Sequence, residues 1–193
     1  MTLTTVDPVA ALVVIDLQEG LRAAPTVPSP PDDIVARTAA LARAFRDRGS
    51  PVLLVRVTVD GAGFSPGRTD AGHRGTGTRP EGWDEVVAEL ADLGDAVITK
   101  RNPGAFVGTD LDVQLRRRGV TQVVLTGIST SMGVESTARA AFDLGYHVVL
   151  VTDAVGDLDE ASHRHVVERV FPRIGETTTT DEALAMLGLP SGR

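Results

Sequence analysis

The sequence contains no cysteine among its 193 residues. This absence excludes disulfide bonds, thiolate metal ligands and every mechanism that needs a cysteine nucleophile. Basic residues are also outnumbered, because 19 Lys and Arg residues stand against 26 Asp and Glu residues and the net charge is −7. Lys and Arg carry the contacts to the phosphates of nucleic acids and anionic membranes, so we expect neither as a partner.

Long apolar runs are missing as well. No stretch approaches the ~18 apolar residues that a membrane-spanning helix needs. The first residues lack the basic region of a signal peptide and include Asp7 and Pro8, which predicts a cytoplasmic protein. A chain of 193 residues with 42% hydrophobic side chains predicts a single domain, residues 1–193, with a full core.

Several motifs of well-defined chemistry are absent. The sequence has no G-x-G-x-x-G after a strand, no Walker-type phosphate loop and no G-x-S-x-G,. No group of His, Asp and Glu residues has the spacing of a zinc site. His163 and His165 are two residues apart on a predicted helix, so they point to different faces and do not form a chelating pair. We therefore expect no metal site.

Short apolar runs alternate along the chain with helical patterns. Asp32 and Asp33 are the expected caps of the first helix and Gly49 its stop, Asp112 is at a capping-box position, and Pro172 is an expected helix stop,. Continuous apolar runs indicate strands that are buried on both faces, and the alternation predicts a parallel sheet with helices on both sides. The expected strands cover residues 11–15, 51–59, 96–99, 122–126 and 147–152, and the expected helices cover about 32–48, 83–93, 109–118, 131–144, 160–170 and 181–187.

Polar or small residues follow several of the predicted strands, at Asp16, Lys100, residues 127–130 and Asp153. Ligands of parallel α/β sheets bind beyond the carboxyl ends of the strands, so these positions are the expected site. A buried carboxylate is costly unless it is paired or functional. Asp16 is therefore either a catalytic group or a structural cap, and Lys100 is either its partner or a surface lysine with a buried stem.

Two further segments carry candidate functions. The small and hydroxyl residues before the helix at 131–144 predict a turn whose backbone N–H groups hold an anion, with an ordinary strand–helix turn as the alternative. Within the following helix, Glu135 and Arg139 are spaced for an ion pair,. Residues 60–80 are rich in Gly and include Arg68, Arg74 and Arg79, which is typical of a substrate lid and equally of a mobile loop or a subunit contact.

Three segments together resemble the isochorismatase-like hydrolases, a superfamily that is also called the cysteine hydrolases. They are VVIDLQEG at 13–20, ITKRNPGAF at 98–106 and TGISTSMGVESTARAAFDLGY at 126–146. The resemblance covers residues from about 10 to 187. It implies a Rossmann-like α/β/α sandwich with a six-stranded parallel sheet, a homodimer or larger homo-oligomer, a non-proline cis peptide at Ile128–Ser129, and no cofactor.

The catalytic residues that the resemblance implies are an Asp, a Lys and a Cys. Asp16 and Lys100 match the first two, and Gly133 stands at the position of the Cys. The metal-binding residues of nicotinamidase-type members have no counterpart beyond Asp60 and His73. Members with Gly at the Cys position hydrolyse vinyl ethers without a covalent intermediate, so the resemblance implies a small anionic enol ether as substrate and Asp16 as general acid.

The same resemblance places substrate-binding residues around these three positions, namely Ser129, Thr130, Ser131, Phe106 and Arg101. The residues after Lys100 and before Gly133 differ from those of true isochorismatases, so the substrate itself is not assigned. Two alternatives stay open. One is a serine-assisted amidase with Ser129 or Ser131 as nucleophile, and the other is a member that binds a small molecule without turning it over.

Overall fold

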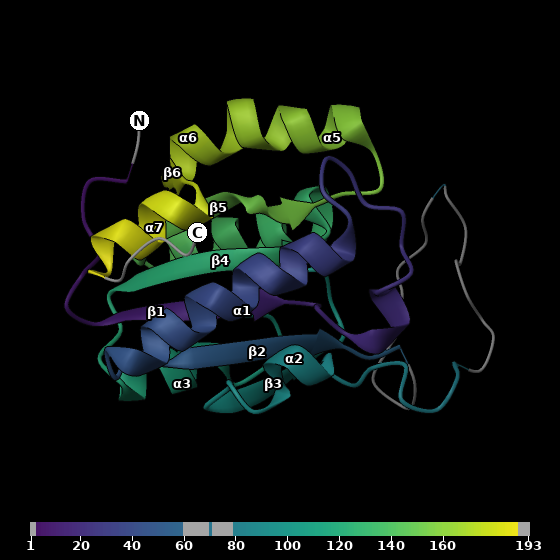
Figure 1. The fold of residues 1–193 in the computed structure, drawn as a ribbon, viewed down its shortest axis with the longest axis horizontal. Helices are drawn as coiled ribbons and strands as arrows, with labels where there is room; N and C mark the ends of the chain where they lie inside the picture. The colour runs from purple at the N-terminus through teal and green to yellow at the C-terminus, as the bar shows by residue number, and fades with distance from the viewer. Residues whose placement is uncertain (1–2, 60–69, 71–78, 189–193) are drawn as a thin grey trace.

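The computed structural model describes residues 3–59, 70 and 79–188. They form a six-stranded sheet in the order β3-β2-β1-β4-β5-β6, and every pairing is parallel. This confirms the predicted three-layer α/β architecture (Figure 1). The strands are β1 (Ala10–Ile15), β2 (Val52–Val57), β3 (Ala96–Lys100), β4 (Gln122–Ile128), β5 (His147–Gly156) and β6 (Glu176–Thr178).

Strand β1 shows why a continuous apolar run makes a central strand. Its side chains alternate between two cores, so Leu12 and Val14 pack on one side of the sheet while Val13 and Ile15 pack on the other. All six residues of the strand are buried. A strand in contact with both helical layers needs apolar residues at every position, because each face of the strand is covered.

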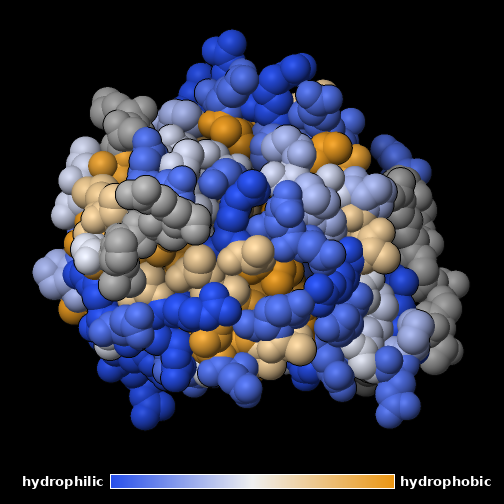
Figure 2. Space-filling model, in the orientation of Figure 1, coloured by the Kyte–Doolittle hydropathy of each residue, from blue (hydrophilic) through white to orange (hydrophobic). Residues whose placement is uncertain are grey.

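The helices divide between the two faces of the sheet. The first core contains residues of α1, α2 and α7, and the second contains residues of α3, α4 and the segment from α5 to α6. In Figure 1, α1 and α7 cross in front of the sheet, and Figure 2 shows that this face mixes polar side chains with smaller apolar areas. The helices are α1 (Pro31–Asp47), α2 (Ala88–Ala91), α3 (Leu111–Arg117), α4 (Glu135–Asp143), α5 (Glu160–His165), α6 (Phe171–Ile174) and α7 (Thr180–Met186).

Three shorter helical turns complete these layers, namely the 3₁₀ turn η1 (Glu19–Leu21) and the π-helical turns η2 (Thr130–Val134) and η3 (Val166–Val170). Turn η2 precedes α4, and η3 joins α5 to α6 in one helical segment. Among the described residues, no helix is long and apolar enough to cross a membrane.

Two predicted helices differ from the sequence-based expectation. Most of the helix expected at 83–93 is absent, because Trp83 and Glu85 give their backbone carbonyls to the amides of Gly20 and Glu19 instead of to a helical turn. Only α2 remains of it. Pro172 does not stop the last long helix either, since it lies in the first turn of α6, where a proline needs no hydrogen-bond donor,.

The predicted caps are also corrected. Asp32 and Asp33 lie inside the first turn of α1, and Pro30 is the residue that precedes the helix, with no side-chain cap. Asp112 does not cap α3, because its carboxylate accepts a 2.7 Å hydrogen bond from the hydroxyl of Tyr146. At α1 the two carboxylates interact favourably with the helix dipole instead of forming a capping bond. At α3 the tertiary contact with Tyr146 takes the place of the capping bond.

Gly127 marks the closest approach of β1 and β4. Its φ is +119°, and a Cβ at this position would fall on the carbonyl group of Ile15. Only glycine combines this backbone conformation with this contact. The strand end that leads into the Ile128–Ser129 turn therefore depends on a residue without a side chain.

We expect Gly127→Ala to lower the free energy of unfolding by about 3 kcal/mol or more, since it adds both backbone strain and overpacking against a central strand. Gly49→Ala is the matched control, because Gly49 also has a positive φ, +71°, but no heavy atom within 4 Å of the added Cβ. Its cost is expected to be about 1 kcal/mol. Denaturant unfolding measures both, and equal losses would contradict the close-approach argument.

Candidate active site

A buried ion pair joins the ends of two strands that are not neighbours. Asp16 directly follows β1 and Lys100 ends β3, with β2 between them in the sheet. The Lys100 side chain crosses over the end of β2, and its Nζ lies 2.8 Å from Oδ2 of Asp16. The strand order alone does not show this contact, because the four-carbon stem of the lysine bridges the intervening strand.

Both charged groups are almost completely buried, with side chains 2% exposed for Lys100 and 7% for Asp16. Burial raises the pKa of Asp16 to about 6, although the positive charge of Lys100 and its hydrogen bond lower it. Removal of the carboxylate from water thus outweighs the ion pair. A pKa in this range lets Asp16 exchange a proton near neutral pH.

The two oxygens of Asp16 have different surroundings. Oδ2 contacts Lys100, whereas Oδ1 is buried and has no hydrogen-bond partner among the residues that the structure describes. Lys100 also donates a 3.2 Å hydrogen bond to the carbonyl of Asn102. A proton on Asp16 is therefore expected on Oδ1, since the ammonium group occupies the other oxygen.

The ion pair lies in a pocket of about 240 Å³ at the carboxyl ends of the strands, as expected for a ligand site in a parallel sheet. Charged, polar and apolar groups share its lining. The lining residues are Asp16, Leu21, Val57, Lys100, Arg101, Asn102, Pro103, Ile128, Ser129, Met132 and Gly133.

Gly133 leaves space directly above the carboxylate. A Cβ added here would lie 3.1 Å from Oδ2 of Asp16 and 3.0 Å from Cγ2 of Ile15. Gly133 belongs to the π-helical turn η2, which follows the cis peptide between Ile128 and Ser129. The structure confirms the predicted cis bond, and the turn after it brings Gly133 against Asp16.

Side chains from other elements hold this turn. The carboxylate of Asp157, just after β5, accepts a hydrogen bond from the backbone N–H of Ser131. Oγ1 of Thr130 lies 3.0 Å from Nδ1 of His163 on α5, and Oγ1 of Thr137 donates a 2.7 Å hydrogen bond to the carbonyl of Gly133. Burial lowers the pKa of His163, which favours the neutral form of the imidazole.

Sequence reasoning missed Asp157 and set His163 aside. Strand β5 extends to Gly156, beyond the end expected from its apolar run, so the carboxylate at its true end escaped notice. Asp153, the candidate at the expected end, instead accepts hydrogen bonds from the N–H and hydroxyl of Thr180. Asp157 directly follows the last residue of β5. A search for polar residues at the carboxyl ends of strands therefore finds Asp157 when the strand is given its full length.

The structure brings together only some of the predicted substrate-binding residues. Ser129 and Arg101 line the pocket beside Asp16. Thr130 and Ser131 are absent from the described lining, and the backbone amide of Ser131 is already bound to Asp157. Phe106 is partly buried and packs against the core, with its ring centroid 6.0 Å from that of Tyr146.

The remaining candidates are placed elsewhere or lie outside the described residues. The guanidinium of Arg79 is 4.7 Å from the ring centroid of Trp83. Asp60, Arg68, His73 and Arg74 lie outside the described residues. In the described part of the chain, no three His, Asp or Glu residues are grouped as metal ligands.

We expect Lys100→Met to raise the pKa of Asp16 above about 6, because the burial that raises it stays while the lysine charge that lowers it is lost,. Carboxyl carbon chemical shifts followed through a pH titration measure this pKa. Arg101→Met is the matched control, since it removes a neighbouring positive charge that is exposed. An unchanged pKa of Asp16 in a folded Lys100→Met variant would contradict the assignment.

Comparison with known proteins places the chain in a family. The isochorismatase domain matches residues 10–182. An uncharacterized isochorismatase family protein of Bacillus subtilis, YwoC, is 43% identical over 178 residues, 90% of this chain and 92% of the relative. The solved structure of an isochorismatase family protein from Burkholderia thailandensis superposes with a TM-score of 0.90 at 42% identity, covering 95% of this chain and 98% of the other.

A more distant structural neighbour is named as an amidase. N-carbamoylsarcosine amidase from Thermoplasma acidophilum superposes with a TM-score of 0.71 at 26% identity, over 90% of this chain and 97% of its own. The family match and the near relatives each cover most of the sequence described above. This protein belongs to the isochorismatase family of hydrolases.

Proposed function

We propose that this chain hydrolyses a small anionic enol ether without a thiol nucleophile, with Asp16 as the general acid. The observation that carries the proposal is the asymmetric environment of the Asp16 carboxyl group. One oxygen is held by Lys100 and the other is buried and unpartnered among the described residues, while burial raises the pKa to about 6. A carboxyl group in this state can deliver a proton to carbon at near-neutral pH.

In the proposed reaction, the Oδ1 proton of Asp16 is transferred to the terminal CH₂ carbon of the enol ether. The electron pair of the C=C bond forms the new C–H bond and leaves an oxocarbenium ion at the ether carbon. Water adds to that carbon and returns a proton to the Asp16 carboxylate. The C–O bond of the hemiketal then breaks, and the hemiketal hydroxyl proton passes to the departing oxygen, which leaves as the alcohol. For a pyruvyl enol ether, one water is consumed and the products are pyruvate and the free alcohol.

Other lining residues have supporting roles in this proposal. Lys100 holds Oδ2, so the proton of the general acid is carried by Oδ1. Gly133 gives the enol ether access to Asp16, since any side chain there would crowd the carboxylate. Arg101 and Ser129 lie on the pocket lining, where they can bind the carboxylate of the substrate.

A serine-assisted amidase is the second candidate, because Ser129 lines the same pocket. A serine hydroxyl is a weak nucleophile unless a base removes its proton. The nearest imidazole described around the turn, that of His163, has its Nδ1 on Thr130. The geometry therefore favours Asp16 over Ser129 as the reactive group.

We expect purified protein to release pyruvate from at least one pyruvyl enol ether in a panel that includes isochorismate, and Asp16→Asn to lose this release by at least a thousandfold. Mass spectrometry of the products measures both, and nicotinamide and simple amides complete the panel. Ser129→Ala is the control for the second candidate. Amide cleavage that survives in Asp16→Asn but not in Ser129→Ala would replace the proposal.

The pH dependence gives an independent check, because the general acid must be protonated in the free enzyme. We expect kcat/KM to be constant below the Asp16 pKa of about 6 and to fall about tenfold per pH unit above it. Initial rates between pH 4.5 and pH 8.5, on the substrate found above, measure the profile. A rate that rises with pH through this range would indicate a base rather than an acid.

A further inference from the structure

A basic groove lies away from the active site, between α4 and the helical segment formed by α5, η3 and α6. We use this name for the hollow of about 490 Å³ that is lined by Arg139, His165, Arg169, Val170, Arg173 and Ile174. None of these residues lines the pocket that contains Asp16. Three guanidinium groups and an imidazole thus surround one hollow whose described lining contains no carboxylate.

The charge of the groove contrasts with that of the chain. The sequence has 26 acidic residues against 19 Lys and Arg, so carboxylate partners are abundant. Arg139 contacts Glu135 at 2.8 Å, in the predicted pairing along α4. Arg169 and Arg173, by contrast, form no ion pair with any described residue. Like charges that line one hollow repel each other, and a bound anion offsets this repulsion.

The spacing of the cations follows from the helices that carry them. His165, Arg169 and Arg173 are four residues apart in sequence and therefore recur on one face of the segment from α5 to α6,. Arg139 comes from the neighbouring helix α4, which packs against α6. The two helices thus bring three guanidinium groups to the lining of one hollow, where one anion can meet more than one of them.

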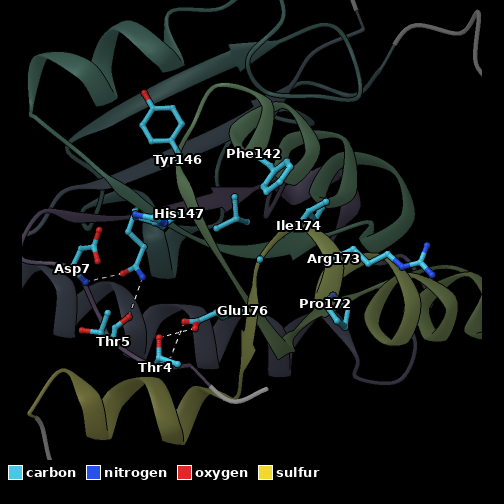
Figure 3. A pocket seen from close by; sticks show the side chains of 13 residues that line it. Thr4, Thr5, Asp7, Phe142, Tyr146, His147, Pro172, Arg173, Ile174 and Glu176 are labelled. Atoms are coloured by element: carbon cyan, nitrogen blue, oxygen red, sulfur yellow. Dashed lines mark hydrogen bonds between the residues drawn. The ribbon is translucent and has the colours of Figure 1, made fainter.

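Apolar residues form the rest of the groove. Val170 is buried and Ile174 is partly buried. Arg173 and Ile174 also line an adjoining hollow of about 370 Å³, which contains the half-exposed ring of Phe142. Figure 3 shows Ile174 and Phe142 in this adjoining hollow, with the side chain of Arg173 extending outward from it. An anion in the groove therefore has apolar surface beside it.

We propose that the basic groove binds a phosphate-bearing small molecule that has at least two phosphate groups. Arginine forks match phosphate oxygens bidentately, and a diphosphate balances several guanidinium charges where a monocarboxylate balances only one. The volume of the hollow, about 490 Å³, is also larger than the volume that a single phosphate group fills. It falls in the usual range of volumes for small-molecule sites. The ligand is an inorganic polyphosphate or a nucleotide, which share this chemistry.

Isothermal titration calorimetry in 25 mM NaCl, with pyrophosphate, ADP and adenosine as probes, tests the proposal. We expect pyrophosphate and ADP to bind and adenosine not to bind. The affinity is expected to fall at least tenfold in 200 mM NaCl, because exposed charges are screened. Binding of ADP tighter than pyrophosphate by tenfold or more identifies a nucleotide as the source, and equal binding identifies the phosphates alone.

Arg169→Gln/Arg173→Gln is the test variant, and we expect it to bind pyrophosphate and ADP at least tenfold more weakly. The matched control is Arg43→Gln/Arg48→Gln, which removes the same charge from exposed positions on or just after α1, a helix on the opposite face of the sheet. Melting temperatures of both variants report on folding. The proposal is overturned by equal binding to native protein and test variant, by equal loss in the control, or by adenosine binding as tightly as ADP.

Discussion

The candidate active site depends on one buried ion pair, between Lys100 and Asp16. Both groups are buried. Removal of the carboxylate from water raises the pKa of Asp16 more than the lysine charge and hydrogen bond lower it, so the pKa rises to about 6. A single buried carboxylate without a cation would be neutral throughout the physiological range, and a well-solvated pair would be fully charged. The pair in this structure lies between these limits, which is the condition for a general acid at near-neutral pH.

The surroundings of this pair require several unusual backbone positions. Asp16 itself has a positive φ of 54°, Gly127 allows β4 to lie against the end of β1, and the cis peptide at Ile128–Ser129 begins the turn that ends beside the carboxylate. Gly133 then keeps a side chain away from Asp16. Among the described residues, Oδ1 of Asp16 is buried and has no hydrogen-bond partner.

The turn above Asp16 is connected to the helical layer that carries the basic groove. His163 on α5 contacts Thr130, and Asp157 just before α5 binds the amide of Ser131. The same helical segment continues through η3 to Arg169 and Arg173. The turn above Asp16 and the basic groove thus contact one helical segment, although no lining residue is common to both pockets.

Local pattern was sufficient for the architecture and for the main candidates. The apolar runs predicted five of the strands, and the polar residues at their ends included Asp16 and Lys100. Strand β6, with the sequence Glu-Thr-Thr, has no apolar run to reveal it. The segment around Trp83 forms turns instead of a helix, because its carbonyls bond to the chain after β1. The partly buried ring of Phe106 packs on that of Tyr146. Sequence periodicity does not predict this contact, because the two residues are far apart in the chain.

The sequence by itself determined the parallel α/β layers, the absence of any thiol chemistry, and the positions of an acid and a cation at two strand ends. These follow from composition and from the spacing of apolar residues, which act locally. Only the tertiary structure decided that Lys100 reaches across β2 to one oxygen of Asp16, that Asp157 rather than Asp153 supports the turn, and that arginines of two helices line one groove. Such contacts depend on strand order, side-chain length and burial, which arise only when segments far apart in the chain pack together.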